Sequence, residues 1–194
     1  VQEVNSAMGV IVAAPTAGGA GVLPAVLTGL AVARGIPDER VIDALATAGL
    51  IGAVIAERAS LSGAEGGCQA ETGAAAAMAA GSATEMLGGS PRQAGHATAL
   101  AMQSTLGLVC DPIGGLVELP CVFRNATGSA IALAAIEMAL ADIEFAIPVD
   151  EVIDVMGQIG REMDVRYRET AGGGLAATPT GRRLARERLY QIKR

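Results

Sequence analysis

The stretch from Gln69 to Leu87 limits how this chain can fold more than any other. Alanine and methionine make up most of it, so a helix formed here can be buried on most of its sides. The 194-residue chain has no tryptophan, two tyrosines and two phenylalanines, so its core must be built from aliphatic side chains and methionine. Helices rich in alanine and glycine can approach one another closely. We therefore predict an all-α fold, a compact single domain of about seven helices over residues 1–194.

Proline, glycine and capping residues divide the chain into the predicted helices. Ser90 is a good N-cap and is followed by Pro91 at the first helical position. Asp38 and Asp150 are also expected to cap helices. The predicted helices cover residues 20–33, 37–58, 69–87, 91–109 and 127–141, with two more starting near 150 and 179. The loops between them are rich in glycine and proline, above all at 15–19, 110–124 and 171–177.

Charge and cysteine content exclude several classes of protein. The formal net charge is −6, whereas a nucleic-acid surface is normally basic, so no nucleic-acid partner is expected. No run of about 20 apolar residues is free of charge, so no membrane span is expected, and the longest candidate, Ile131–Leu140, contains Glu137. Three cysteines, an odd number, do not make a disulfide framework. We expect a cytoplasmic protein.

The three cysteines, Cys68, Cys110 and Cys121, each lie beside glycine or proline or in a loop that contains them. They are spaced 42 and 11 residues apart, which matches neither the closely paired ligands of zinc fingers nor the compact ferredoxin pattern. A single cysteine is more often a small buried apolar residue than a ligand. Spacing alone therefore leaves two interpretations equally open, a metal site or three buried thiols.

Longer motifs around these cysteines carry a resemblance to a known family. The motifs are N-S-A-M-G (5–9), A-P-T-A-G-G-A-G (14–21), E-G-G-C-Q-A-E (65–71), L-G-L-V-C-D-P (106–112), G-L-V-E-L-P-C (115–121), R-N-A (124–126) and E-T-A-G-G-G-L-A-A-T-P-T-G (169–181). Together they resemble the catalytic α domain of iron–sulfur-dependent L-serine dehydratases, in order and over nearly the whole chain. The chain corresponds to the later part of that domain.

The resemblance implies a cofactor and a reaction. In the family the cysteines that match Cys68, Cys110 and Cys121 hold a 4Fe–4S cluster, and three thiolates leave one iron without a protein ligand. An open metal position is a Lewis acid, which here would polarise the hydroxyl of L-serine on the way to pyruvate and ammonia. No pyridoxal phosphate is expected, since the one lysine, Lys193, lies at the extreme C-terminus. The alternatives are a related lyase acting on cysteine or threonine, and a non-enzymatic iron–sulfur oxygen sensor.

Candidate substrate contacts come from the matched motifs, and for those that could donate to the substrate carboxylate, plain loop geometry is the competing explanation. They are Thr16, Glu65, Asn125, Thr170 and Gly172.

Other polar residues near the motifs leave more than one reading open. Either Glu65 or Glu71, which flank Cys68, could bind the substrate ammonium, and for Glu71 helix capping is a comparable explanation. Arg124 either offsets cluster charge or faces water. His96, the single histidine, is expected to be a packed helix residue. The resemblance then implies that the catalytic base and the rest of the site lie on a β domain or β subunit absent from this chain, and that the enzyme is an oligomer.

Overall fold

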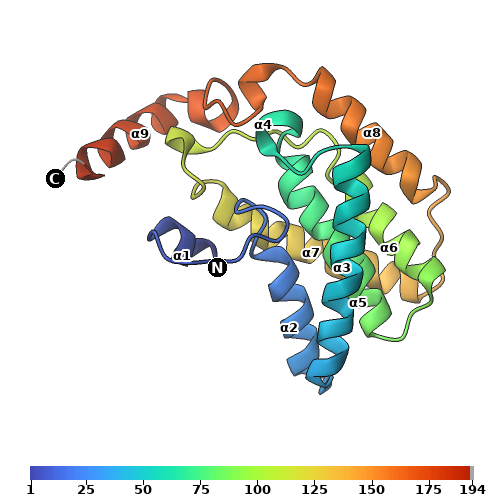
Figure 1. Cartoon of the computed structure of the whole chain (residues 1–194). Coiled ribbons are helices and arrows are strands. Elements are labelled where there is room, and N and C mark those ends of the chain that lie inside the picture. The colour runs from blue at the N-terminus through green and yellow to red at the C-terminus, as the bar shows by residue number, and fades with distance from the viewer. Residues whose placement is uncertain (193–194) are drawn as a thin grey trace.

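The computed structural model describes residues 1–192, with side chains described as far as Glu187. This part of the chain contains nine α-helices, seven of them at least seven residues long, and no strand (Figure 1). Both the all-α class and the expectation of about seven helices are confirmed. The long helices are α2 (Val22–Arg34), α3 (Asp38–Arg58), α5 (Ala74–Met86), α6 (Pro91–Gln103), α7 (Cys121–Leu140), α8 (Val149–Glu162) and α9 (Pro179–Ile192). The short ones are α1 (Gln2–Ser6) and α4 (Gly63–Gly66).

Helix α5 is the centre of the bundle, as its small side chains predict. All of its residues except Glu85 are buried, and it packs against α2, α3, α6 and α7. A Cβ atom added at Gly81 would collide with Thr98 on α6 and with Ile51 on α3. Glycine at this position is therefore what lets three helices approach so closely, and no aromatic side chain is needed to fill the core.

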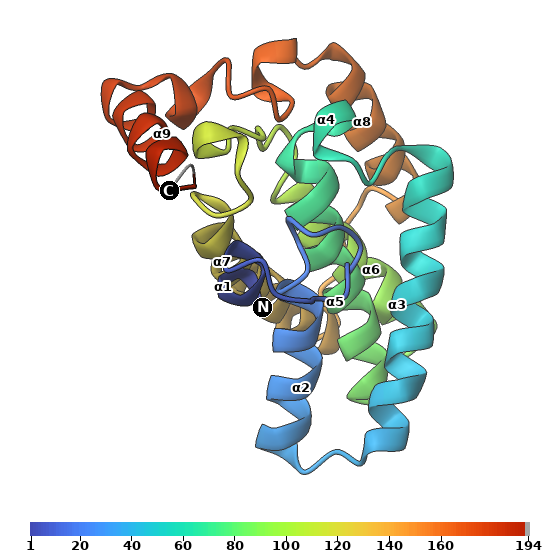
Figure 2. The same ribbon diagram turned by 60° about the vertical axis from the view of Figure 1, so that its left-hand side comes forward.

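The two ends of the bundle differ in character. Figures 1 and 2 show that the turn joining α2 to α3 lies at one end of the molecule. Helix α4, the end of α8 and the segment that leads from α8 to α9 lie toward the other end. The second end collects the short 3₁₀ segments η2 (Ile113–Gly115), η3 (Val165–Tyr167) and η4 (Gly174–Ala177). It also holds a π-helical turn, η1 (Gln69–Gly73), which leads directly into α5. Such turns are frequent at functional sites.

The buried side chain of Gln69 ties this turn to its neighbours. Its Nε2 atom donates to the backbone oxygen of Met156 on α8 at 3.0 Å, and its Oε1 atom accepts from the amide of Gly107 at 2.9 Å. The turn after Cys68 is thereby fixed to α8 and to the segment that leads to Cys110.

Two of the predicted boundaries were wrong. Helix α6 ends at Gln103 and does not continue to Val109, because the chain turns there and Gly107 adopts a left-handed φ of 81°. Helix α7 begins at Cys121, six residues earlier than predicted, because the amides of Phe123 and Arg124 already donate to the backbone oxygen of Pro120. The predicted loop over 110–124 is therefore shorter, and its last cysteine is helical.

The capping predictions were right at one helix and wrong at two. Ser90 caps α6 in a complete capping box with Gln93. Asp38 and Asp150 instead lie inside the first turns of α3 and α8, where their charge still favours the helix N-terminus. Within residues 1–192 no helix is both long enough and apolar enough to cross a membrane.

Candidate metal centre

The three cysteines come from three separate elements and are all buried. Cys68 directly precedes η1, Cys110 lies in the loop after α6, and Cys121 is the first residue of α7. Their exposed fractions are 3%, 3% and 5%, and none of them forms a disulfide. Cys121 is therefore at a helix N-terminus, where the helix dipole favours a thiolate.

The three buried thiols, which we call the cysteine pocket, are near enough to affect one another's ionisation. Burial is the main reason why the pKa of all three thiols is raised, to about 12 for Cys121. The next cause for both Cys110 and Cys121 is the negative charge of Cys68. The structure thus brings together the three residues that the sequence singled out as a ligand set, although they are far apart along the chain.

A buried carboxylate, Glu71, lies against this pocket. The hydroxyl of Thr16 donates to its Oε1 atom at 2.6 Å, and the thiol of Cys110 lies 3.8 Å from its Oε2 atom. Burial raises the pKa of Glu71, the Thr16 hydrogen bond opposes this, and the charge of Glu169 adds to it. Glu71 is therefore neither a helix cap nor a surface residue, and its side chain joins the glycine-rich loop at Thr16 to a cysteine.

Glu169 reaches the same place through a backbone pairing that the sequence did not reveal. Cys110 pairs with Arg168 in an isolated parallel β-bridge. The Cys110 amide donates to the backbone oxygen of Tyr167, and the Glu169 amide donates to the backbone oxygen of Cys110, both at 2.8 Å. Glu169 has a left-handed φ of 63°, which is uncommon for a residue with a side chain. Ligand atoms of Glu71, Cys110 and Glu169 lie within 4.8 Å of one another.

Two glycines make room for this arrangement. A Cβ at Gly63 would lie 2.8 Å from Oε2 of Glu71 and 3.1 Å from the sulfur of Cys110. Gly67, just before Cys68, has a φ of 76°, and a Cβ there would lie 2.9 Å from the backbone oxygen of Leu108. The backbone of these two glycines therefore forms part of the pocket wall.

An ion pair fixes the loop of Cys110 to the helix of Cys121. Nη2 of Arg124 lies 2.8 Å from Oδ1 of the buried Asp111, and its Nη1 donates to the backbone oxygen of Val109 at 2.8 Å. The Oδ2 atom of Asp111 accepts from the amide of Leu175 at 2.6 Å. Arg124 therefore does not face water, and its positive charge lowers the pKa of Cys121 against the larger effect of burial.

Asn125 uses its amide to hold the glycine-rich loop. Its Nδ2 atom donates to the backbone oxygens of Gly18 and Cys121 at 2.7 and 2.8 Å, and its Oδ1 atom accepts from the amide of Gly21 at 2.9 Å. The prediction that Asn125 contacts a substrate stays a prediction. What the contacts establish is that Asn125 positions residues 18–21 against the start of α7.

A cleft of about 380 Å³ opens beside the cysteine pocket. Among the residues that line it are Thr16, Ser60, Glu65, Glu71 and Glu169. Two of the five predicted substrate contacts, Thr16 and Glu65, thus lie on one cleft, and Glu65 is held there by a 2.6 Å hydrogen bond from Ser60.

The other predicted contacts on the glycine loop lie outside that cleft. Thr170 and Gly172 are exposed; the Thr170 hydroxyl donates to the backbone oxygen of Val165 and accepts from the amide of Gly172. The neighbouring Glu169 faces the cleft instead, and its place in the matched E-T-A-G-G-G motif was the signal that could have found it. His96 is a half-buried helix residue whose Nδ1 atom accepts from the amide of Phe145 at 3.2 Å, as predicted. Lys193 lies outside the described residues.

The family of this chain follows from comparison with known proteins. The family model described as "Serine dehydratase alpha chain" matches residues 1–176. The chain belongs to this family. Membership implies an iron–sulfur cluster, and the three buried cysteines are the thiols that the chain offers for one.

Individual relatives agree with the family assignment. The chain is 54% identical over 185 residues to the "Probable L-serine dehydratase, alpha chain" of Bacillus subtilis, covering 95% of this chain and 62% of that protein. It is 48% identical over 189 residues to the "L-serine dehydratase, alpha chain" of Peptoniphilus asaccharolyticus, covering 97% and 65%. A Latilactobacillus sakei protein named as a probable alpha chain is 50% identical over 179 residues, covering 92% and 86%. The chain thus spans somewhat less than two thirds of the first two relatives.

Proposed function

We propose that this chain holds a 4Fe–4S cluster on Cys68, Cys110 and Cys121 and is the cluster-bearing part of an enzyme that converts L-serine to pyruvate and ammonia. The observation that carries the proposal is the convergence of three buried thiols, all the cysteines of the chain, next to a polar cleft. Its relatives are named L-serine dehydratases.

The donor set fits such a cluster. Thiolates are the usual protein ligands of iron–sulfur clusters, and ligands must lose their protons when they bind metal. Burial raises the pKa of all three thiols in the metal-free chain, so a bound cationic centre supplies the positive charge that thiolates require. When bound through three thiolates, the cluster keeps one iron without a protein ligand, and this iron can act as a Lewis acid on a hydroxyl group.

The cleft residues would bind and orient the amino acid. Glu71 and Glu169 present carboxylates next to Cys110 and suit the ammonium group of serine, while Thr16 keeps the Glu71 carboxylate directed at this place. Gly63 also lines the cleft, and its lack of a side chain leaves room for the Glu71 carboxylate and the Cys110 thiol. We interpret Glu65, which also lines the cleft, as part of the entrance.

A second chain belongs to the proposal. All three relatives described above are named as alpha chains, two of them as probable ones, which implies a β chain. We propose that the present chain is the later part of an α domain and that the β chain supplies the proton acceptor for the α-proton. The β chain would meet the substrate at the cleft lined by Thr16 and Glu169.

Anaerobic reconstitution tests the cofactor. We expect iron and sulfide analysis to give four of each per wild-type chain, by the definition of the 4Fe–4S type, with an EPR signal after reduction that L-serine alters. Cys68→Ala, Cys110→Ala and Cys121→Ala should each abolish the cluster, whereas Ser82→Ala, a buried control in α5, should keep it. An intact cluster in two of the three cysteine variants would refute the proposed ligand set.

Activity is tested separately. Pyruvate formation from L-serine should be low with this chain alone and should rise when a β chain of a relative is added. Rapid turnover by the isolated chain would show that the proton acceptor lies on the chain itself and that this part of the proposal is wrong.

A further inference from the structure

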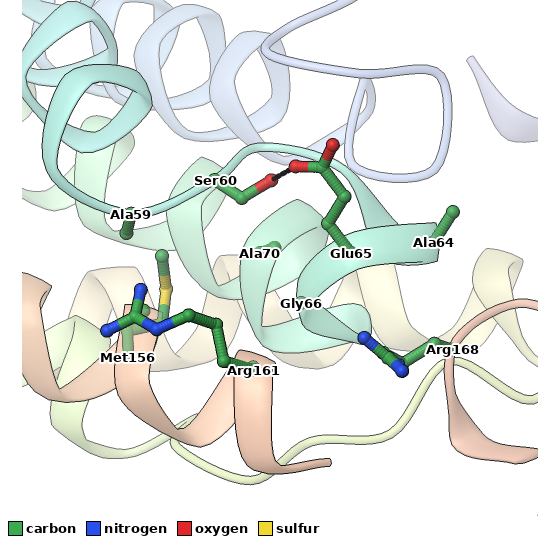
Figure 3. Close-up of a pocket in the computed structure, with 11 residues that line it drawn as sticks. Ala59, Ser60, Ala64, Glu65, Gly66, Ala70, Met156, Arg161 and Arg168 are labelled. Carbon is green, nitrogen blue, oxygen red and sulfur yellow. Dashed lines mark hydrogen bonds between the residues drawn. The ribbon is translucent and has the colours of Figure 1, made fainter. Parts of the chain in front are cut away.

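A second cavity lies between α4 and η1 on one side and α8 on the other (Figure 3). Its volume is about 360 Å³, within the range of small-ligand sites. Alanines, glycines and Met156 form much of the wall, and its charged residues are Glu65, Arg161 and Arg168. The cavity is distinct from the cleft of Thr16, Glu71 and Glu169, although both are lined by Ala59, Ser60 and Glu65.

The two arginines of this cavity have no counterion in the described part of the chain. The Nε atom of Arg168 is buried and has no hydrogen-bond partner, and neither Arg161 nor Arg168 takes part in an ion pair there. A guanidinium group does not lose its proton in proteins, so a buried N–H without an acceptor carries an uncompensated desolvation cost. Arg58, Arg124 and Arg166, by contrast, each have a carboxylate partner within 3 Å.

The charges of the cavity favour an anion. Glu65 is its single carboxylate among the lining residues, and this carboxylate already accepts a hydrogen bond from Ser60 at 2.6 Å. Figure 3 shows Arg161 on α8 and Arg168 on the segment after η3, with Ser60 and Glu65 on the opposite wall. The two labelled arginine side chains stand apart in Figure 3, which suits a ligand with an anionic group at each end.

We propose that this cavity binds a small dicarboxylate, with one carboxylate on Arg161 and the other on Arg168. A guanidinium group offers two parallel N–H donors that match a carboxylate, and such charge-assisted pairs are strong. The ligand would supply the acceptor that the buried Nε atom of Arg168 lacks. The small residues around it leave the space in which the carbon chain would lie.

The position of the site connects it to the metal centre. Arg168 pairs through its backbone with Cys110, and Gly66 of the cavity wall stands two residues before Cys68. A dicarboxylate in the cavity would therefore hold both cysteine-bearing segments in place. This site does not require the cluster, and its test stands apart from the test of the proposed function.

Isothermal titration of the purified chain with malonate tests the site, with acetate as the single-carboxylate comparison. We expect malonate to bind more tightly than acetate, and Arg161→Gln and Arg168→Gln each to weaken malonate binding about tenfold or more, since a hydrogen bond to a charged group contributes about 1.5–3 kcal/mol. The matched control is Arg166→Gln, which removes a neighbouring arginine that is exposed and paired with Asp164. Unchanged malonate affinity in both cavity variants, or no heat from the wild type up to about 10 mM, where a Kd near 1 mM is saturated, overturns the proposal.

Hydrogen exchange of the wild type shows where malonate binds, and a charge-conserving variant separates loss of binding from loss of folding. Malonate should protect the amides of residues 64–70 and 165–169 in the wild type. Arg168→Lys keeps the charge but loses the planar pair of donors, so it should bind malonate with an affinity between those of the wild type and Arg168→Gln. Protection confined to other segments would show that malonate binds elsewhere and would refute the site.

Discussion

Replacing Asp111 by alanine tests how the metal centre is held together. The substitution removes the carboxylate that pairs with Arg124 at 2.8 Å and accepts from the amide of Leu175 at 2.6 Å. The side chains of Asp111 and Arg124 are 3% and 17% exposed, so a cation is left without its partner where water reaches it poorly. Breaking a buried pair from one side costs about 3–5 kcal/mol, and we expect the free energy of unfolding to fall by about that amount.

A surface pair provides the matched control for this prediction. Asp154 and Arg58 also form a close pair, at 2.6 Å, but their side chains are 53% and 39% exposed. Asp154→Ala should therefore cost less than about 1 kcal/mol. Both free energies are measured by urea unfolding of the metal-free chain, followed by circular dichroism. Equal costs for the two variants would refute the argument that burial gives the Asp111 pair its role.

The same variant should also affect metal binding. Asp111 joins the loop of Cys110 to α7, which begins with Cys121, so its loss removes the contact that sets these two thiols relative to each other. We expect Asp111→Ala to retain less iron than Asp154→Ala after identical anaerobic reconstitution and gel filtration. Full iron content in Asp111→Ala would mean that the thiols are positioned without this ion pair.

Three further substitutions test the backbone and the charges around the site. Gly67→Ala should lower the free energy of unfolding in urea by about 2–4 kcal/mol, because φ is 76° and the new Cβ meets the backbone oxygen of Leu108. The control Gly88→Ala has a φ of 92° but open space around the new Cβ, so it should cost only the strain of the left-handed backbone. Ala171→Gly should raise stability by up to about 1 kcal/mol by relieving a left-handed φ of 53°, and a loss of stability would contradict this. Glu71→Gln should make the metal-free chain increasingly more stable than the wild type as the pH rises. Burial raises the folded-state pKa of Glu71, so the contribution of this carboxyl group to folding stability is complete only below its usual pKa of 4.5 and is lost as the pH rises. A difference that does not change between pH 4 and 7 would contradict the last prediction.

The sequence predicted the elements whose cause is local. The alanine-rich stretch around Met78 became the buried helix α5, and Ser90 became the N-cap of α6, because side-chain size and capping act within a few residues. The three cysteines could be singled out from their neighbours in the chain. Helix ends at Gln103 and Cys121 were missed, because they depend on turns whose hydrogen bonds no simple pattern encodes.

The partners of the cysteines could not be predicted in this way. Glu169 approaches Cys110 only because residues 167–169 pair with the backbone of Cys110, a contact between segments far apart in sequence. Asp111 was adjacent to a candidate ligand, yet nothing in its surroundings indicated that Arg124 would be its partner and not water. Long-range pairing of this kind is a tertiary property and becomes visible only once the helices are packed.

The arrangement of the pocket also suggests why its metal and its fold depend on each other. Each thiol is supplied by a different element, and each element is held by contacts that cross the pocket: Gln69 binds α8, Asp111 binds α7, and Cys110 binds the segment before η4. A metal centre ligated by all three thiols would add a further link among the same elements, and metal affinity then appears as folding free energy. A chain that loses one thiol should therefore be less stable when reconstituted, although its metal-free stability changes little. This difference separates a ligand from a buried structural cysteine, since a structural cysteine would affect both forms equally.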